Sequence, residues 1–396
     1  MQYNPMAPEV RADPYPYYKW LRENAPVFFI EEMNCYALSR YDDVRYVLKN
    51  HQLFSSDPLI QIAFGEFNPA PDADYLISSD PPNHTRLRRA LGAAFSMKIV
   101  ESMTDRITSL ARELIDEASF KDRLDFVPAF TSPLPVTVIA ELMGIDIDMR
   151  DAFRRWSNEV TVGTDSNISD ETRAAIRASA AEFRAYFEGA IARRRATPGA
   201  DLVSALIRAQ DETGQLNAEE VLAFCLLLLI GGNETTTSTI GNALYLLSRY
   251  PEQKQKVLAD RSLVPNLVEE SLRYISPIQL LFRRTTQPVE IGGVQMPENT
   301  LVMPIYASAN RDEAHFPNGD TFDVTRDTRE HMAFGHGIHH CMGALLGRHE
   351  GVIAMNLLLD RMADYEVELD GVEWLDSFYL KGPKVLPMRR RLAAAA

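Results

Sequence analysis

The longest helical pattern in the chain, residues 217–249, constrains the fold more than any other feature. Asn217 and Glu220 are spaced as a capping box at its start, and Tyr250 before Pro251 predicts its end. At about 1.5 Å per residue the helix is roughly 50 Å long, which is enough to cross a whole domain. A chain of 396 residues can bury such a helix in a sizeable core.

Helical patterns also dominate the rest of the chain, and β-structure is minor. The predicted helices are 14–24, 41–50, 97–118, 171–195 and the end of the segment 335–362. The predicted β-segments are a hairpin at 27–39 and a strand–turn–strand pattern at 289–305, whose turn contains Gly292 and Gly293. The polar segment 163–170 predicts a loop. We therefore expect a single mainly α domain with small β-sheets over residues 1–396, with 392–396 set aside as a candidate added tail.

The composition argues against several classes of function. Asp and Glu number 55 and Lys and Arg 41, so the net charge is −14 and we expect no nucleic-acid partner. The longest apolar run, 221–230, is too short to span a bilayer, and the N-terminus lacks the pattern of a signal peptide. We therefore expect no membrane anchor and a cytoplasmic location. Three cysteines give no disulfide framework and fit a reducing compartment.

The segment 334–343, FGHGIHHCMG, places Cys341 in a glycine-punctuated loop just before an apolar helical pattern at 344–359. Glycines let the backbone turn tightly and approach a flat ligand. A helix N-terminus stabilises a thiolate, so this cysteine is suited to be an anionic axial ligand of a metal cofactor.

Two other interpretations of this segment stay open from the residues alone. Cys341 could be a small buried residue, as we expect for Cys35 and Cys225. It could also belong to a zinc site, because nitrogen and sulfur ligands at short spacing suit that metal. The candidate zinc ligands beside Cys341 are His331, His336, His339 and His340.

The same segment is similar to the haem-binding loop of the cytochrome P-450 family, Phe-x-x-Gly-x-x-x-Cys-x-Gly. Phe334, Gly337, Cys341 and Gly343 fill its fixed positions, and the resemblance extends over about residues 10–391. It implies the cytochrome P-450 fold, with haem b between the long central helix and the Cys-loop helix and Cys341 as the axial ligand of iron. Thiolate ligation favours O–O cleavage.

The long helix carries Gly231, Gly232, Asn233, Glu234 and Thr235 in its interior. Each glycine costs about 1 kcal/mol there relative to alanine, which predicts a kink or a close ligand. A lone Thr235 would more often bond back to a backbone carbonyl. By the resemblance, Gly232 is a cofactor-binding residue, Thr235 hydrogen-bonds dioxygen, and Glu234 helps to relay protons as a general acid.

Glu270 and Arg273 are three residues apart, so both side chains lie on one face of a helix. Alone, such a pair is usually a weak surface ion pair. The resemblance makes it a buried structural pair that braces the Cys loop. Thr321 stands where many relatives carry a third member of this network, an arginine, and Arg326 is the candidate substitute. The role of His340, in place of an apolar or aromatic residue, stays open.

Four basic residues are expected to hold the haem propionates by the same resemblance. His84 and Arg88 lie one helical turn apart, Arg283 follows the Glu270 helix, and His339 precedes Cys341 by two residues. Cationic donors match carboxylates, although each residue alone would more often be a solvated charge. Arg284 could exchange roles with Arg283. Phe334 and Gly343 complete the expected haem contacts.

The substrate pocket is expected above the haem, lined by the segments 59–77, 160–178 and 278–282, by the long helix and by 378–380. The candidate lining residues are Phe64, Phe67, Leu227, Leu228, Leu280, Leu281 and Tyr379. These segments are largely apolar, which predicts a lipophilic substrate such as a terpenoid, polyketide, fatty acid or aromatic compound.

The resemblance implies a monooxygenase of secondary metabolism that hydroxylates or epoxidises its substrate with O₂ and two external electrons. Electrons would come from NAD(P)H through a ferredoxin reductase and a ferredoxin, because the chain has no room for a fused donor domain. We expect a monomer whose ferredoxin docks near a basic patch of Arg86, Arg89 and Arg348. A peroxide-driven peroxygenase and a haem-based sensor are the alternatives; the Glu234–Thr235 pair disfavours both.

Overall fold

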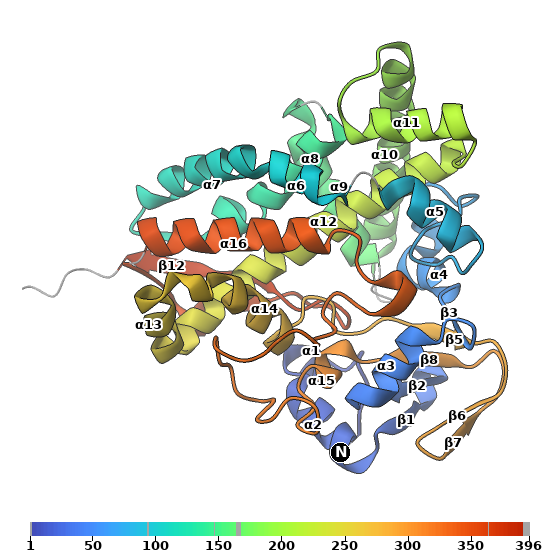
Figure 1. The fold of residues 1–396 in the computed structure, drawn as a ribbon, viewed down its shortest axis with the longest axis vertical. Helices are drawn as coiled ribbons and strands as arrows, with labels where there is room; N and C mark the ends of the chain where they lie inside the picture. Colours follow the sequence, from blue (N-terminus) through green and yellow to red (C-terminus); the bar gives the residue numbers. More distant parts are fainter. Residues whose placement is uncertain (1, 93–94, 146, 164–167, 363, 391–396) are drawn as a thin grey trace, which may run out of the picture.

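The computed structural model describes residues 2–92, 95–145, 147–163, 168–362 and 364–390 (Figure 1). The α-helices are α1 (Pro8–Ala12), α2 (Tyr15–Asn24), α3 (Tyr41–Lys49), α4 (Pro58–Ala63), α5 (Asn83–Gly92), α6 (Met97–Ser102), α7 (Thr104–Ser119), α8 (Pro133–Met143), α9 (Arg150–Gly163), α10 (Asp170–Ala196), α11 (Leu202–Thr213), α12 (Ala218–Arg249), α13 (Pro251–Ala259), α14 (Val264–Tyr274), α15 (Tyr306–Ala309) and α16 (Ala344–Arg361). The strands are β1 (Val27–Ile30), β2 (Cys35–Leu38), β3 (Phe54–Ser55), β4 (Arg123–Asp125), β5 (Arg283–Thr285), β6 (Val289–Ile291), β7 (Val294–Met296), β8 (Leu301–Pro304), β9 (Tyr365–Val367), β10 (Glu373–Trp374), β11 (Pro383–Val385) and β12 (Pro387–Arg390).

Helix α12 runs through the middle of the molecule and packs against α8, α9, α14 and α16 (Figure 1). The expected capping box is present: the Asn217 side chain accepts from the Glu220 N–H at 2.8 Å, and the Glu220 carboxylate accepts from the Asn217 N–H at 2.8 Å. By length and composition α12 could cross a membrane, but 72% of its most apolar window is buried inside the protein. Its length and apolar composition are therefore those of a helix buried in the protein core.

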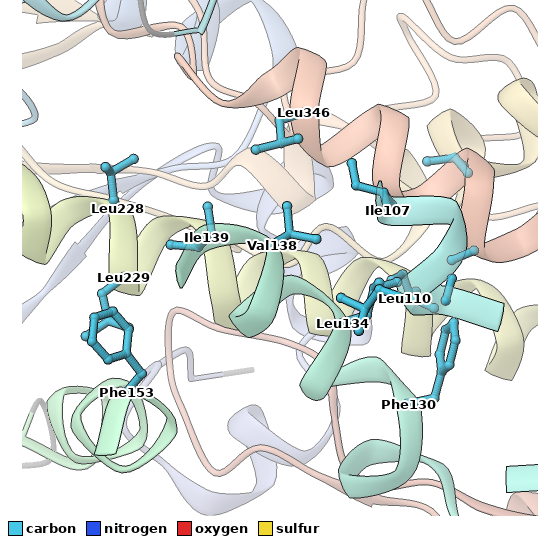
Figure 2. Packing of buried hydrophobic residues seen from close by; sticks show 14 of the residues in the cluster. Ile107, Leu110, Phe130, Leu134, Val138, Ile139, Phe153, Leu228, Leu229 and Leu346 are labelled. Atoms are coloured by element: carbon cyan, nitrogen blue, oxygen red, sulfur yellow. The ribbon is translucent and has the colours of Figure 1, made fainter. Parts of the chain in front are cut away.

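The main core forms where α8, α9, α14 and α16 pack against α12, and α7 packs in turn on α16 and α8. Figure 2 shows Leu228 and Leu229 of α12 with Phe153 of α9 and Ile139 of α8, and Leu346 of α16 lies nearby. Burying such side chains removes apolar surface from water at about 25 cal/mol per Å². This packing fixes the position of α16 relative to α12.

The predicted helix at 97–118 is in fact two helices, α6 and α7, which meet at Met103. The Ser102 hydroxyl donates to the Ile99 carbonyl and the Thr104 hydroxyl to the Glu101 carbonyl, each at 2.7 Å. Side chains that bond the local backbone compete with the helical ladder, which explains the break. Half of the predicted loop at 163–170, residues 164–167, lies outside the described residues, as does the set-aside tail at 392–396.

The main sheet has the strand order β1-β2-β8-β5-β3. The hairpin β1–β2 is antiparallel, as the sequence predicts, and β2 pairs with β8 in parallel. The second predicted pattern forms the β6–β7 hairpin, with Gly292 and Gly293 at φ 57° and 79° in its turn. This sheet carries Arg283 on β5, and it brings the N-terminal region beside the Cys-loop half of the chain.

Glu350 of α16 is buried, with one carboxylate oxygen that has no hydrogen-bond partner. Burial raises its pKa from 4.5 to about 8. The folded protein therefore keeps this proton up to about pH 8, whereas the unfolded chain releases it near pH 4.5. The contribution of Glu350 to stability is therefore fully present below the pKa of the unfolded chain, and it is lost as the pH rises to the pKa of the folded protein.

We expect Glu350→Gln to raise the melting temperature by a few degrees at pH 8.5 and by much less at pH 5. The amide stays neutral and removes the penalty for burying a charge. Thermal unfolding at both pH values measures the effect. Glu117→Gln, on the exposed side of α7, is the matched control and should change neither value. An equal rise in melting temperature at both pH values would contradict the raised pKa of Glu350.

Candidate active site

The Cys loop is held in a fixed shape by its own backbone and by α3. The Cys341 N–H donates to the Phe334 carbonyl at 2.8 Å, and the His340 N–H donates to the Gly337 carbonyl at 3.1 Å. Gly335 and Gly337 have φ values of 70° and 71°, which glycine adopts without strain. A Cβ on Gly337 would also collide with the Leu48 carbonyl oxygen at the end of α3.

Cys341 is accessible even though protein atoms surround it closely. Burial raises the pKa of its thiol, while the N–H groups of Gly343 and Ala344 at the start of α16 act in the opposite direction, together with Arg348 and Arg88. The other two cysteines, Cys35 and Cys225, are buried, as expected. An accessible sulfur at a helix N-terminus can serve as a ligand to a bound metal group.

The histidines of the loop do not converge on a metal. The His331 Nε2 lies 2.8 Å from Glu269 Oε2, whereas the His339 ring packs against His84 at 4.6 Å between centroids. In the described part of the chain, no three His, Cys, Asp or Glu side chains are grouped to hold a metal ion. The geometry therefore does not support the zinc interpretation.

Helices α12 and α16 lie side by side and point the same way. A Cβ on Gly347 would lie 3.8 Å from the Thr236 hydroxyl, and a Cβ on Gly351 would lie 3.9 Å from a Thr239 methyl. The later residue of α16, Gly351, lies beside the later residue of α12, Thr239, so the two helices run parallel. The residues that precede Gly347 and Thr236 therefore lie at the same end of the helix pair. These residues include Cys341 and the two glycines of α12.

The two glycines of α12 face different surroundings. A Cβ on Gly231 would meet nothing within 4 Å, and this residue is exposed. A Cβ on Gly232 would lie 2.5 Å from the Ile139 side chain of α8. The open glycine is thus Gly231, whereas Gly232, which is predicted to bind the cofactor, adjoins Ile139 and allows two helices to pack closely. The helix continues without interruption through both residues.

Beside these glycines, Thr235 donates its hydroxyl hydrogen to the Gly231 carbonyl. Glu234 is buried, and this burial raises its pKa above the usual value. The neighbouring Asn233 donates to the Ser157 hydroxyl at 2.8 Å. The site thus holds an acid with a raised pKa and a hydroxyl whose lone pairs can still accept a hydrogen bond.

The four predicted basic residues gather beside the Cys loop. His84 and His339 are in ring contact, and each has a buried Nε2 without a hydrogen-bond partner. Burial, followed by Arg283, His84 and Arg88, lowers the pKa of His339 to about 2. Arg88 donates to the His340 carbonyl at 2.9 Å. The residue that joins this group is Arg283, because Arg284 pairs with Asp57 at 3.3 Å instead.

Glu270 and Arg273 form a wholly buried bidentate ion pair, with N–O distances of 2.7 and 2.8 Å. Arg326 approaches the same carboxylate at 3.3 Å. Thr321 contributes only its backbone carbonyl, which accepts from Arg273 at 3.0 Å. Arg326 therefore fills the place in the network that the sequence left open at Thr321.

Glu269 is a further member of the site that the sequence analysis missed. Its carboxylate accepts from Arg348 at 2.6 Å and lies 2.8 Å from His331. Burial alone would raise the pKa of Glu269, but these two hydrogen bonds lower it to about 2. The guanidinium of Arg348 also lies 4.3 Å from the centroid of Phe334, at the start of the Cys loop.

The expected basic patch is not formed as predicted. Arg86 pairs with Glu220 at 2.6 Å, and Arg348 pairs with Glu269 at 2.6 Å. Both arginines are thus neutralised by carboxylates from distant parts of the chain, while Arg89 is exposed. A docking surface made of these three residues would carry less positive charge than expected.

The predicted pocket residues differ in how accessible they are. Phe67, Leu227, Leu281 and Tyr379 are half-buried, while Phe64 and Leu228 are nearly covered. Leu280 is fully buried in a separate cluster with Leu21 and Met303, so its assignment as a lining residue is corrected. Four residues of the segment 160–178, 164–167, lie outside the described residues.

We expect Gly337→Ala to destabilise the folded protein by several kcal/mol more than Gly293→Ala. Both glycines have positive φ, but only Gly337 faces a backbone oxygen, and a Cβ at Gly293 would meet nothing within 4 Å. The control variant should cost about 1 kcal/mol for the backbone strain alone. Urea unfolding measures both. Equal losses would show that the contact with α3 has no energetic weight.

Comparison with known proteins identifies relatives along the whole chain. The chain matches the family Cytochrome P450 over residues 11–381. It is 39% identical to 6-deoxyerythronolide B hydroxylase of Saccharopolyspora erythraea, over 95% of this chain and 96% of the relative. It is 36% identical to the cytochrome P450 monooxygenase PikC of Streptomyces venezuelae, over 96% of this chain and 92% of the relative.

Solved structures agree with these relatives. Cytochrome P450 CYP109Q5 from Chondromyces apiculatus is 39% identical, with a TM-score of 0.88, and the match covers 99% of this chain and 98% of that one. CYP109E1 from Bacillus megaterium, solved with testosterone, is 32% identical with a TM-score of 0.88, over 98% of this chain and 100% of the other. The chain therefore belongs to the cytochrome P450 family and is a haem-thiolate monooxygenase.

Proposed function

We propose that Cys341 supplies the axial thiolate of the haem and that Glu234 and Thr235 form the proton-delivery site. The observation that carries this proposal is the parallel contact of α12 and α16, which brings the accessible Cys341 sulfur and the open space at Gly231 to one end. A thiolate-ligated haem supplies the chemistry that activates O₂ with two electrons. These roles belong to one catalytic domain spanning residues 1–396.

The basic group beside the Cys loop fits the two carboxylates of haem b. His84 and His339 each bury a ring nitrogen that has no partner, which is costly unless an acceptor arrives. Arg88 and Arg283 act electrostatically on the same place, since both lower the pKa of His339 after burial. We assign His84, Arg88, Arg283 and His339 to the propionates.

Phe334 and Gly343 both adjoin Cys341. A Cβ on Gly343 would lie 4.0 Å from the Cys341 sulfur, which is an ordinary van der Waals separation. The Phe334 carbonyl accepts from the Cys341 N–H, and its ring is covered by Arg348. Both residues are therefore assigned to the proximal face of the haem.

The proton is held and passed by side chains of α12. Burial favours the neutral form of Glu234, so this carboxyl can hold a proton for transfer. The Thr235 hydroxyl is the next group of the proposed proton relay. It donates to the Gly231 carbonyl, which orients it, and its oxygen can accept a proton or a hydrogen bond. Together they act as a general acid for the bound co-substrate.

The substrate class follows from the accessible apolar residues and from the relatives. Phe67, Leu227, Leu281 and Tyr379 offer apolar surface, which suits a lipophilic molecule. One relative is named Cyclomarin C epoxidase, and one solved neighbour holds corticosterone. We propose hydroxylation or epoxidation of a lipophilic polyketide, terpenoid, fatty acid or aromatic compound. Electrons would arrive from NAD(P)H through ferredoxin reductase and ferredoxin to a monomer in the cytoplasm.

We expect Cys341→Ser to abolish monooxygenation and to remove the spectrum of a thiolate-ligated haem. Serine is a much weaker ligand than thiolate, so haem content should fall as well. The measurement is the absorption of the dithionite-reduced, carbon-monoxide-treated protein, which in the unsubstituted chain should show a Soret band strongly shifted to long wavelength. Cys225→Ser, at a buried cysteine, is the control and should keep the band. A shifted band in Cys341→Ser would overturn the assignment.

We expect Thr235→Ala to retain ligand binding but to uncouple NADH consumption from product, with release of peroxide. Thr235→Ser, which keeps the hydroxyl, should stay coupled. The ratio of peroxide formed to NADH consumed measures the difference. Unchanged coupling in the alanine variant would show that protons enter by another route.

A further inference from the structure

His51 lies in the turn between α3 and β3, where the chain passes over the Cys loop. The same turn follows Leu48, whose carbonyl closes against Gly337. The His51 side chain is half-buried, and its Nδ1 is buried without a hydrogen-bond partner. A buried ring nitrogen without a partner costs stability unless a ligand supplies one.

His51 is close enough to act on both histidines of the basic group. Burial is the main cause of the lowered pKa of His84 and of His339, and His51 lowers both further. His84 and His339 are themselves in ring contact at 4.6 Å. His51 thus lies within electrostatic range of this pair, and each of the three imidazoles has one buried nitrogen without a partner.

The protein supplies little negative charge to this cluster. In the described part of the chain, His51, His84, Arg88, Arg283 and His339 form no ion pair with a carboxylate. The carboxylate that acts on His84 is Asp80, which already accepts from the Ser55 hydroxyl and, at 3.3 Å, from the Ser56 N–H. The described residues also offer no metal site here. Arg88 and Arg283 keep their positive charge, and a ligand with carboxylates would balance it while accepting hydrogen bonds from the imidazoles.

We propose that His51 is a fifth donor to the haem carboxylates and ties the α3–β3 turn to the cofactor. The inference rests on the proposed function, because it needs haem at Cys341. Two carboxylates present four oxygens, each able to accept more than one hydrogen bond, so a fifth donor has an acceptor available. His51 then binds haem from the turn after α3, on a different element from the four donors already assigned.

The test is the rate at which haem leaves the holoprotein for excess apomyoglobin. We expect His51→Ala to lose haem about tenfold faster than the unsubstituted chain, because a charge-assisted hydrogen bond is removed. His51→Gln keeps an N–H donor and should recover part of the loss. His349→Ala is the matched control: its ring lies 2.9 Å from the Thr104 hydroxyl, and the rate should not change.

Reconstitution with haem dimethyl ester separates binding from structure. The ester has no carboxylate, so the unsubstituted chain and His51→Ala should then lose it at the same rate. Loss of a hydrogen-bond donor to a carboxylate should also lower the reduction potential of the native-haem variant. If His51→Ala does not fold, His51→Leu and His51→Gln provide the same comparison.

Two outcomes would overturn the inference. Equal rates with native haem would show that His51 makes no contact with the carboxylates, and an equal acceleration with the diester would show a purely structural role. The proposed function fails separately, if the reduced, carbon-monoxide-treated protein lacks the band of a thiolate-ligated haem.

Discussion

The buried ion pair of Glu270 and Arg273 is the interaction on which the arrangement of the Cys-loop half depends. Neither side chain is exposed, and Arg273 also donates to the carbonyls of Asn310, Gly319 and Thr321. Removing one partner of such a pair leaves an uncompensated charge and costs about 3–5 kcal/mol. One helix, α14, thereby fixes the irregular segment that precedes the loop.

This bracing matters because the segment around it has little regular structure of its own. Between α15 and α16 the chain makes turns whose carbonyls need donors. Arg326 supplies several of these, donating to Pro317 at 2.7 Å and to Asn318 at 3.0 Å while it approaches Glu270. The neighbouring Glu269 then holds Arg348 of α16. Two adjacent carboxylates of α14 therefore orient both ends of the Cys-loop segment.

Sequence patterns identified the local features of this site well. The capping box of α12, the i, i+3 spacing of Glu270 and Arg273 and the glycine-punctuated Cys loop are all set by residues a few positions apart. The propionate group was predicted through a resemblance, and the structure brings its members together. What the sequence could not supply was the direction in which a helix position faces, as at Gly232, whose surroundings depend on the position of α8.

Pairing between distant residues was equally hard to predict. Arg86 and Arg348 are charged residues with no visible partner in the sequence, yet Glu220 and Glu269 neutralise them. Leu280 has the same apolar character as its neighbour Leu281, and only the tertiary fold decides which of the two remains accessible.

The adjacent glycines of α12 have a consequence for how such an enzyme can change over time. Gly232 sets the spacing of α12 and α8, while Gly231 opens toward free space from a different face of the helix. Close helix packing at Gly232 and open space at Gly231 are therefore independent of each other, although the two residues are neighbours in the sequence. A lineage can therefore alter the room at Gly231 by a single substitution without repacking the contact with Ile139, so that the scaffold and the pocket can diversify at different rates.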